Sequence, residues 1–115
     1  MVMVKSENPR VTKREAKLLN DIIVALCADY DRRKQCALDS KMSKRVLMEY
    51  VYINSRLFDA AAEIAGPSFA EQYIYDIGNS VGYARTELYI FSEPTYKDYK
   101  ARIKENMLKK LKFID

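Results

Sequence analysis

Side chains that commonly perform chemistry are scarce in this chain. Histidine, the commonest general base and transition-metal ligand, is absent from the 115 residues. The two cysteines, Cys27 and Cys36, fall nine residues apart on one expected helix, which separates them by about 13 Å and places them on opposite faces. Because a disulfide needs Cα atoms within about 7 Å, we expect two free thiols, and we expect neither a metal site nor a cofactor.

Carboxylates give little support for catalysis. Asp59 and Glu63 are four residues apart on an expected exposed stripe, and they can hold a divalent cation only if further carboxylates converge on them. The chain has no phosphate-binding glycine loop, no nucleophile elbow and no catalytic triad. We therefore expect a protein that is not an enzyme. An enzyme that uses carboxylates and tyrosines ranks last among the alternatives.

Basic residues form the first candidate binding site. The formal net charge is +4, and in an up-down bundle the basic end of the last helix lies beside the basic start of the first. Lysines in a last turn complement the helix dipole, but Lys13 and Arg14 lie in a first turn, where the dipole disfavours cations. The alternative function is therefore nucleic-acid binding through phosphate contacts. Its candidate residues are Arg10, Lys13, Arg14, Lys109, Lys110 and Lys112.

The second candidate site is a stripe on the segment from Ser68 to Phe91. Apolar residues recur there at alternating steps of four and three, and Ser68 with Glu71 forms a capping box, so the pattern predicts one continuous helix. The adjacent stripe carries two glycines one turn apart, which let another backbone approach closely. Its members are Glu71, Tyr75, Gly78, Gly82, Arg85 and Tyr89.

Two interpretations of this glycine–tyrosine stripe follow from the sequence. Another helix of the same chain can pack into the notch, or the stripe can bind a partner helix or a second copy of the chain. Tyrosine and arginine are enriched at binding hot spots. We therefore expect a non-enzymatic regulator, adaptor or inhibitor that binds a protein partner through the stripe, with help from the basic residues.

Two other features have both a functional and a structural interpretation. Tyr96 and Tyr99 alternate with Lys97 and Lys100, a pattern that can stack on single-stranded nucleic acid, but the helical spacing of the tyrosines favours the edge of the core. Asn54 interrupts an apolar stripe. A lone buried asparagine of this kind sets the register of helix packing.

Four helices are expected to position these residues. Thr12 and Glu15 form a capping box that begins the first helix, whose charged part from Asp29 to Lys34 is expected to bend or stand clear of the core. The expected helices are Thr12 to Leu38, Ser43 to Gly66, Ser68 to Phe91, and Thr95 to about Lys112. Residues 1–11 are expected to form an N-terminal tail, and residues 12–115 a single domain.

The composition favours an all-α fold. Only three glycines and three prolines are present, too few for the turns of a sandwich or barrel. Short connections predict an antiparallel up-down four-helix bundle, with surplus apolar surface available for a homodimer. No apolar run reaches the roughly 18 residues of a membrane span, and the N-terminus lacks the apolar core of a signal peptide. We therefore expect a cytoplasmic protein without a membrane partner.

Overall fold

The computed structural model describes residues 12–38 and 41–115, and this part of the chain is helical without strands. The all-α prediction is therefore confirmed for it. The elements are α2 (Lys13–Ala28), α3 (Tyr30–Cys36), α4 (Lys44–Ala65), α5 (Pro67–Gly78), the short 3-10 helix η1 (Tyr83–Arg85) and α6 (Glu93–Lys110). The expected tail, with Arg10, lies outside the described residues. Within the described ranges, no helix is both long and apolar enough to cross a membrane.

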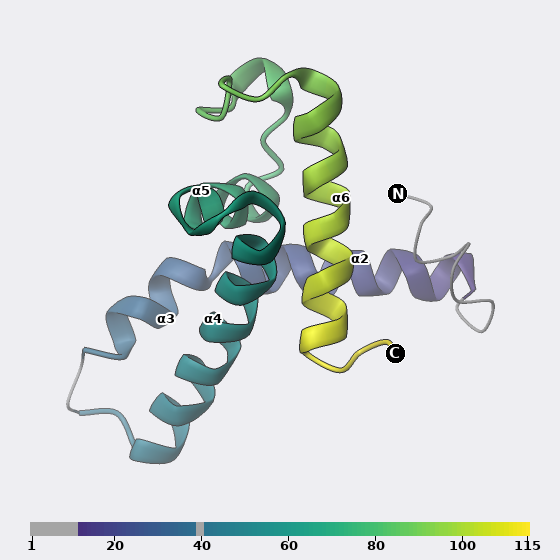
Figure 1. Cartoon of the computed structure of the whole chain (residues 1–115). Helices are drawn as coiled ribbons and strands as arrows, with labels where there is room; N and C mark the ends of the chain where they lie inside the picture. Colours follow the sequence, from purple (N-terminus) through teal and green to yellow (C-terminus); the bar gives the residue numbers. More distant parts are fainter. Residues whose placement is uncertain (1–11, 39–40) are drawn as a thin grey trace.

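The helices cross one another instead of lying in one alignment. Figure 1 shows α4 and α6 running in opposite directions, while α2 passes behind α6 at a steep angle. The helix α5 follows α4 directly and packs against both α4 and α2. The up-down four-helix bundle is therefore not confirmed, although the helices do form one compact domain.

The core lies where these helices cross. Ile23, Leu57, Ile74 and Ile103, one from each of α2, α4, α5 and α6, are fully buried. An aromatic cluster extends the core toward the start of α6, where Tyr73 stacks on Tyr96 with ring centroids 5.5 Å apart. The prediction that tyrosines of the last helix form the edge of the core is therefore confirmed.

The first expected helix is divided into two. Its start is as predicted, because the Thr12 hydroxyl accepts a bond from the Glu15 amide at 3.1 Å and the Glu15 carboxylate accepts one from the Thr12 amide at 2.9 Å. The helix is interrupted at Asp29, and α3 then leaves in a new direction (Figure 1). The predicted bend is thus confirmed as a break. Cys27 and Cys36 lie on either side of it and are both free thiols.

The second expected helix is confirmed as α4. The Ser43 hydroxyl accepts a bond from the Val46 amide at 3.3 Å, which caps the helix start. The helix ends before Gly66, whose φ of 93° is a conformation that other residues rarely adopt. Pro67 then opens α5, where its fixed φ suits a first helical position.

The prediction of a continuous helix from Ser68 to Phe91 is wrong. The helix α5 ends at Gly78, and the chain then turns through Ser80, which has a positive φ of 53°. The turn folds back on α5, because the Val81 amide donates to the Asp76 carbonyl oxygen at 2.9 Å. Leu88 still reaches the core, but it does so from the irregular segment that follows η1. The apolar periodicity therefore fits a continuous helix, and it fits equally the observed chain, in which a helix is followed by a turn and an irregular segment.

The start of the last helix also differs from the prediction. The N-cap of α6 is Ser92, not Thr95, and Pro94 occupies the first turn. The Ser92 hydroxyl donates to the Thr95 hydroxyl at 3.0 Å, so Thr95 is already inside the helix. Proline is favoured in a first turn because the missing amide would have no intrahelical partner there.

Candidate functional site

The structure separates the residues of the glycine–tyrosine stripe. Glu71, Tyr75 and Gly78 lie on α5, while Gly82 follows the end of that helix. The remaining members are Arg85 at the end of η1 and Tyr89 in the turn before α6. The six residues do not form one continuous helical surface, so the prediction that they form a stripe on a single helix is wrong.

Gly78 serves a contact within the chain. A Cβ atom at this position would lie 2.5 Å from the Ala28 backbone nitrogen and 2.6 Å from the Cys27 carbonyl carbon. The end of α2 therefore crosses α5 with backbone against backbone. A Cβ atom at Gly82, in contrast, would meet nothing within 4 Å. Of the two interpretations of the notch, packing by another helix of the same chain holds at Gly78.

Glu71 is also engaged within the chain. Its carboxylate accepts hydrogen bonds from the Tyr30 hydroxyl and the Lys34 ammonium, each at 2.8 Å. These donors hold the pKa of Glu71 below its ordinary value, the Lys34 bond being the larger cause. Burial, with this hydrogen bond in second place, raises the pKa of Tyr30. Glu71 thus ties α5 to α3, whereas Tyr75 and Tyr89 are exposed.

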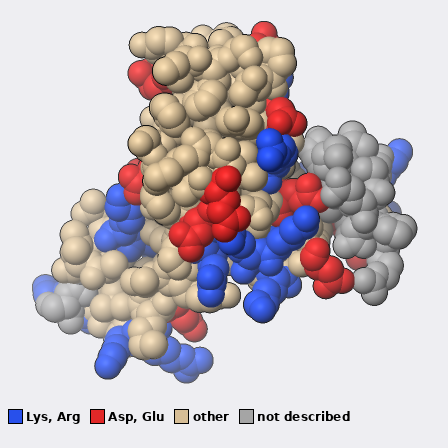
Figure 2. Space-filling view, viewed as in Figure 1, with Lys and Arg blue, Asp and Glu red and all other residues tan. Residues whose placement is uncertain are grey.

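The basic side chains of α6 are largely paired with groups of the same chain. Lys110 lies 2.5 Å from the Glu63 carboxylate, and Lys109 lies 3.9 Å from that of Glu105. Figure 2 shows blue side chains with red ones beside them across this face. Lys112, Lys13 and Arg14 are exposed. The charges on the described residues are therefore mixed, and the predicted merger of the two basic groups stays a prediction.

An apolar groove lies between α3 and α4. It has a volume of about 450 Å³. Its walls are mainly apolar, with Ala37 and Leu38 after α3 and with Val51 and Phe58 on α4. Leu38 is 83% exposed and Val51 is 55% exposed, so the groove presents apolar side chains to solvent at its mouth.

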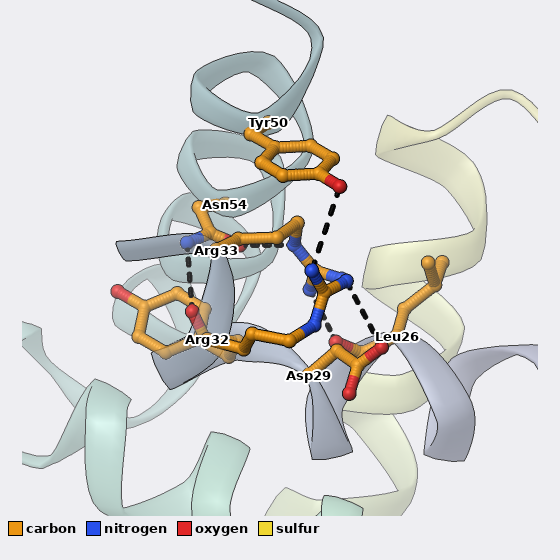
Figure 3. A network of polar contacts seen from close by, with 7 residues as sticks. Leu26, Asp29, Arg32, Arg33, Tyr50 and Asn54 are labelled. Carbon is orange, nitrogen blue, oxygen red and sulfur yellow. Dashed lines mark hydrogen bonds and ion pairs between the residues drawn. The ribbon is translucent and has the colours of Figure 1, made fainter. Parts of the chain in front are cut away.

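A polar network holds α3 against α4 at the base of this groove (Figure 3). The Arg33 Nε donates to the Asn54 Oδ1 at 2.7 Å, and a second Arg33 nitrogen donates to the Leu26 carbonyl oxygen. The Asn54 amide donates in turn to the Tyr30 carbonyl oxygen at 3.0 Å. Asn54 therefore satisfies Arg33 and a carbonyl group near the helix break, while its role in helix register stays a prediction.

Arg32 forms the exposed part of the network. Its guanidinium lies 3.3 Å from the Asp29 carboxylate, 3.5 Å from the Tyr50 hydroxyl, and over the Tyr50 ring. Half of the Arg32 side chain is open to solvent, whereas Arg33 is buried. The two neighbouring arginines thus differ in their surroundings and offer a matched pair for mutation.

No known protein family, characterised protein or solved structure matches this chain. The described residues also hold no group of three or more cysteine, aspartate and glutamate side chains arranged to bind a metal ion. A functional proposal for the chain therefore rests on the groove, on the network beneath it and on the surface charges around it.

Sequence reasoning missed the residues that form the groove. Arg33 continues the apolar series of the first helix at the step of three after Tyr30, so its burial could have been inferred from the periodicity. Leu38 and Val51 are ordinary aliphatic residues in sequence. The position of Leu38 at the groove depends on the break at Asp29, after which α3 packs against α4.

The first prediction tests the network below the groove. Replacing Arg33 by methionine or Asn54 by leucine is expected to lower the free energy of unfolding by about 2 kcal/mol each, because the half-buried Asn54 or the buried Arg33 is left without its hydrogen bond. The double variant is expected to lose about 1 kcal/mol less than the sum of the single effects. Urea unfolding measured by circular dichroism checks this. Arg32→Met, next in the chain but exposed, is the control and should change stability by less than about 0.5 kcal/mol.

Proposed function

We propose that the chain is a non-enzymatic helical module that binds a protein partner in the groove between α3 and α4. The observation that carries the proposal is the exposure of Leu38 and Val51 at the mouth of an apolar groove of about 450 Å³. Side chains of this kind favour burial against a partner, by about 1.5–3 kcal/mol for each one removed from water. A role as regulator, adaptor or inhibitor, and a cytoplasmic location, belong to the same proposal.

The dimensions of the groove fit a short helix. Its α4 wall extends from Tyr50 to Asp59, a rise of about 13 Å, which corresponds to between two and three helical turns. The α3 wall is contributed by one short helix and the two residues that follow it. An amphipathic helix that lays its apolar face into such a groove is a common mode of peptide recognition.

The charges near the groove favour an acidic partner segment. Lys34 lines it and is paired with Glu71, and Lys44 and Arg45 are exposed in the first turn of α4, before the groove lining on that helix begins at Tyr50. Figure 2 shows blue side chains at the lower end of the molecule, where α4 begins in Figure 1. Asp59 at the opposite end is the acidic residue of the lining. We therefore propose that the partner segment is an amphipathic helix with acidic residues beside its apolar face.

A designed peptide tests this proposal. A peptide of about 14 residues, with leucines at i, i+3, i+4 and i+7 and glutamates between them, is titrated into the ¹⁵N-labelled full chain. The amide signals of the groove residues are expected to shift most. Leu38→Asp is expected to weaken peptide binding about tenfold or more, because it places a charge in the apolar contact.

Two controls make the result specific. Leu18→Asp changes the same residue type at another exposed position, on α2, and is expected to leave the affinity unchanged. A peptide with lysines in place of glutamates is expected to bind more weakly. Equal peptide affinity for the Leu38→Asp variant and the unmodified chain, or signal shifts centred away from the groove, would contradict the proposal.

Nucleic-acid binding is the second proposal, and it has less support. Lys13, Arg14 and Lys112 are exposed, as phosphate contacts require, but Lys109 and Lys110 are paired with carboxylates. A labelled single-stranded oligonucleotide, followed by fluorescence anisotropy, distinguishes the two proposals. A steep fall in affinity between about 50 and 200 mM salt would favour phosphate contacts.

Self-association, expected from surplus apolar surface, is a separate proposal that concerns the outer face of α4.

A further inference from the structure

The outer face of α4 carries apolar side chains that do not contact the core. Met48, Val51 and Tyr52 are 64%, 55% and 43% exposed. A shallow hollow of about 350 Å³ lies beside them, lined by Met48, Glu49, Tyr52 and Ile53. Single exposed apolar residues are ordinary, but an apolar patch next to a hollow on one helix face indicates a surface for interaction.

The charges on the same face are ordered along the helix. Exposed Lys44 lies before the apolar residues and exposed Asp59 lies after them. Positions 44, 48, 51, 55 and 59 share one face because they follow steps of four and three. Along these five positions the charge is basic at the start and acidic at the end, with Met48, Val51 and Ser55 between, so this line of residues is complementary to a copy of itself that runs in the opposite direction.

We propose that this face of α4 pairs with the same face of a second copy of the chain, antiparallel about a twofold axis between Val51 and Tyr52. Positions equally far from the axis then lie opposite each other. Val51 faces Tyr52 of the second copy, and Lys44 faces Asp59 of the second copy. Each contact occurs twice, as a twofold interface requires. The antiparallel orientation also sets opposite ends of the two helix dipoles together.

The pairing leaves room for its apolar side chains. Met48 faces Ser55 of the second copy, so a long flexible side chain meets a short one. The hollow lined by Tyr52 and Ile53 accommodates an apolar side chain of the second copy. Because the apolar patch is small, the interface falls at the low end of specific interface areas, and the dimer dissociates in the micromolar range.

Leu38 and α3 take no part in the dimer, but Val51, Ser55 and Asp59 line the groove as well as the pairing face, so the peptide and the second copy compete for this part of α4. The apolar test is therefore made at Met48, which does not line the groove. An unmodified chain that binds the peptide but stays monomeric overturns this inference alone. An unmodified chain that dimerises but does not bind the peptide at concentrations where it is monomeric overturns the proposed function alone.

Sedimentation velocity of the full chain from about 1 to 300 µM is the first test. A monomer–dimer equilibrium is expected, and Met48→Asp is expected to raise the dissociation constant at least about tenfold. Leu18→Asp, a substitution of another aliphatic residue of similar exposure on α2, is expected to leave the equilibrium unchanged. A chain that stays monomeric throughout this range overturns the inference, as does a Met48→Asp variant that dimerises like the unmodified chain.

A charge exchange tests the antiparallel register. Lys44→Glu alone and Asp59→Lys alone each create two like-charge contacts in the dimer, and each is expected to weaken it roughly tenfold. The double variant restores both opposite-charge contacts, so its dissociation constant is expected within about threefold of the original. A double variant that associates no better than the single variants overturns the register. Restored association also shows that the substituted chains are folded.

Discussion

Gly78→Ala is expected to lower the free energy of unfolding by about 3 kcal/mol, although alanine is the better helix former. The added methyl group would lie 2.5 Å from the Ala28 backbone nitrogen and 2.7 Å from its Cα atom. Backbone atoms cannot rotate away as the end of a flexible side chain can, so α2 or α5 has to shift. Such a shift disturbs the packing of Ile23 and Ile77, which are buried on these two helices.

Gly82→Ala is the matched control for this prediction. Gly82 has φ −90° and ψ 171°, which alanine adopts without strain, and a Cβ there has nothing within 4 Å. The substitution is expected to raise stability slightly, by about 0.5 kcal/mol, because it restricts the unfolded chain. Thermal or urea unfolding of both variants measures the difference. Equal stability of the two variants would contradict the close crossing of α2 and α5 at Gly78.

Element boundaries were predictable where local chemistry sets them. Thr12 with Glu15, and Ser43, cap their helices through bonds between residues three apart, and Gly66-Pro67 ends one helix and begins the next. These signals do not depend on the rest of the fold. The start of α6 was misplaced because Thr95 and Ser92 are both plausible caps, and the proline between them selects the earlier one.

Periodicity alone misled the prediction over the longest stretch of the chain. The apolar series through Val81 and Leu88 fits a helix, but a continuous helix would hold Asp76 and Thr86 about 15 Å apart along its axis. In the structure the chain turns after Gly78, and Thr86 bonds to the buried Asp76. This polar contact requires the turn, and the periodicity of a single sequence gives no sign of such a contact.

The candidate groove could not be predicted for a related reason. Its α3 wall exists because the chain breaks at Asp29, and the break is held by Arg33, which reaches the Leu26 carbonyl oxygen and Asn54 on α4. The sequence indicated a bend and a special role for Asn54, but not their connection. That connection decides that Leu38 lies at a groove mouth rather than at the end of a straight helix.

Asp76→Ala is expected to be the other strongly destabilising substitution, by about 3 kcal/mol. The fully buried carboxyl group of Asp76 accepts bonds from the Tyr96 hydroxyl at 2.6 Å, from the Gln72 amide at 3.0 Å and from the Thr86 hydroxyl. Burial, more than the bond to Asp76, raises the pKa of Tyr96 to about 12, so the phenol keeps its proton and remains a donor. Removing the acceptor leaves buried hydroxyl groups without their partner.

Asp76 also joins α5, the segment after it and α6, so its loss is expected to act beyond one contact. Hydrogen exchange of the amides between residues 79 and 92 should accelerate in Asp76→Ala more than exchange in α4, because the bond from Thr86 to Asp76 anchors this segment to α5. Asp98→Ala is the control, since Asp98 is exposed on α6 and forms an ion pair with Arg102 at 3.4 Å. That substitution should change stability by less than about 0.5 kcal/mol. Equal effects of the two substitutions would show that the buried carboxyl group does not hold the segment in place.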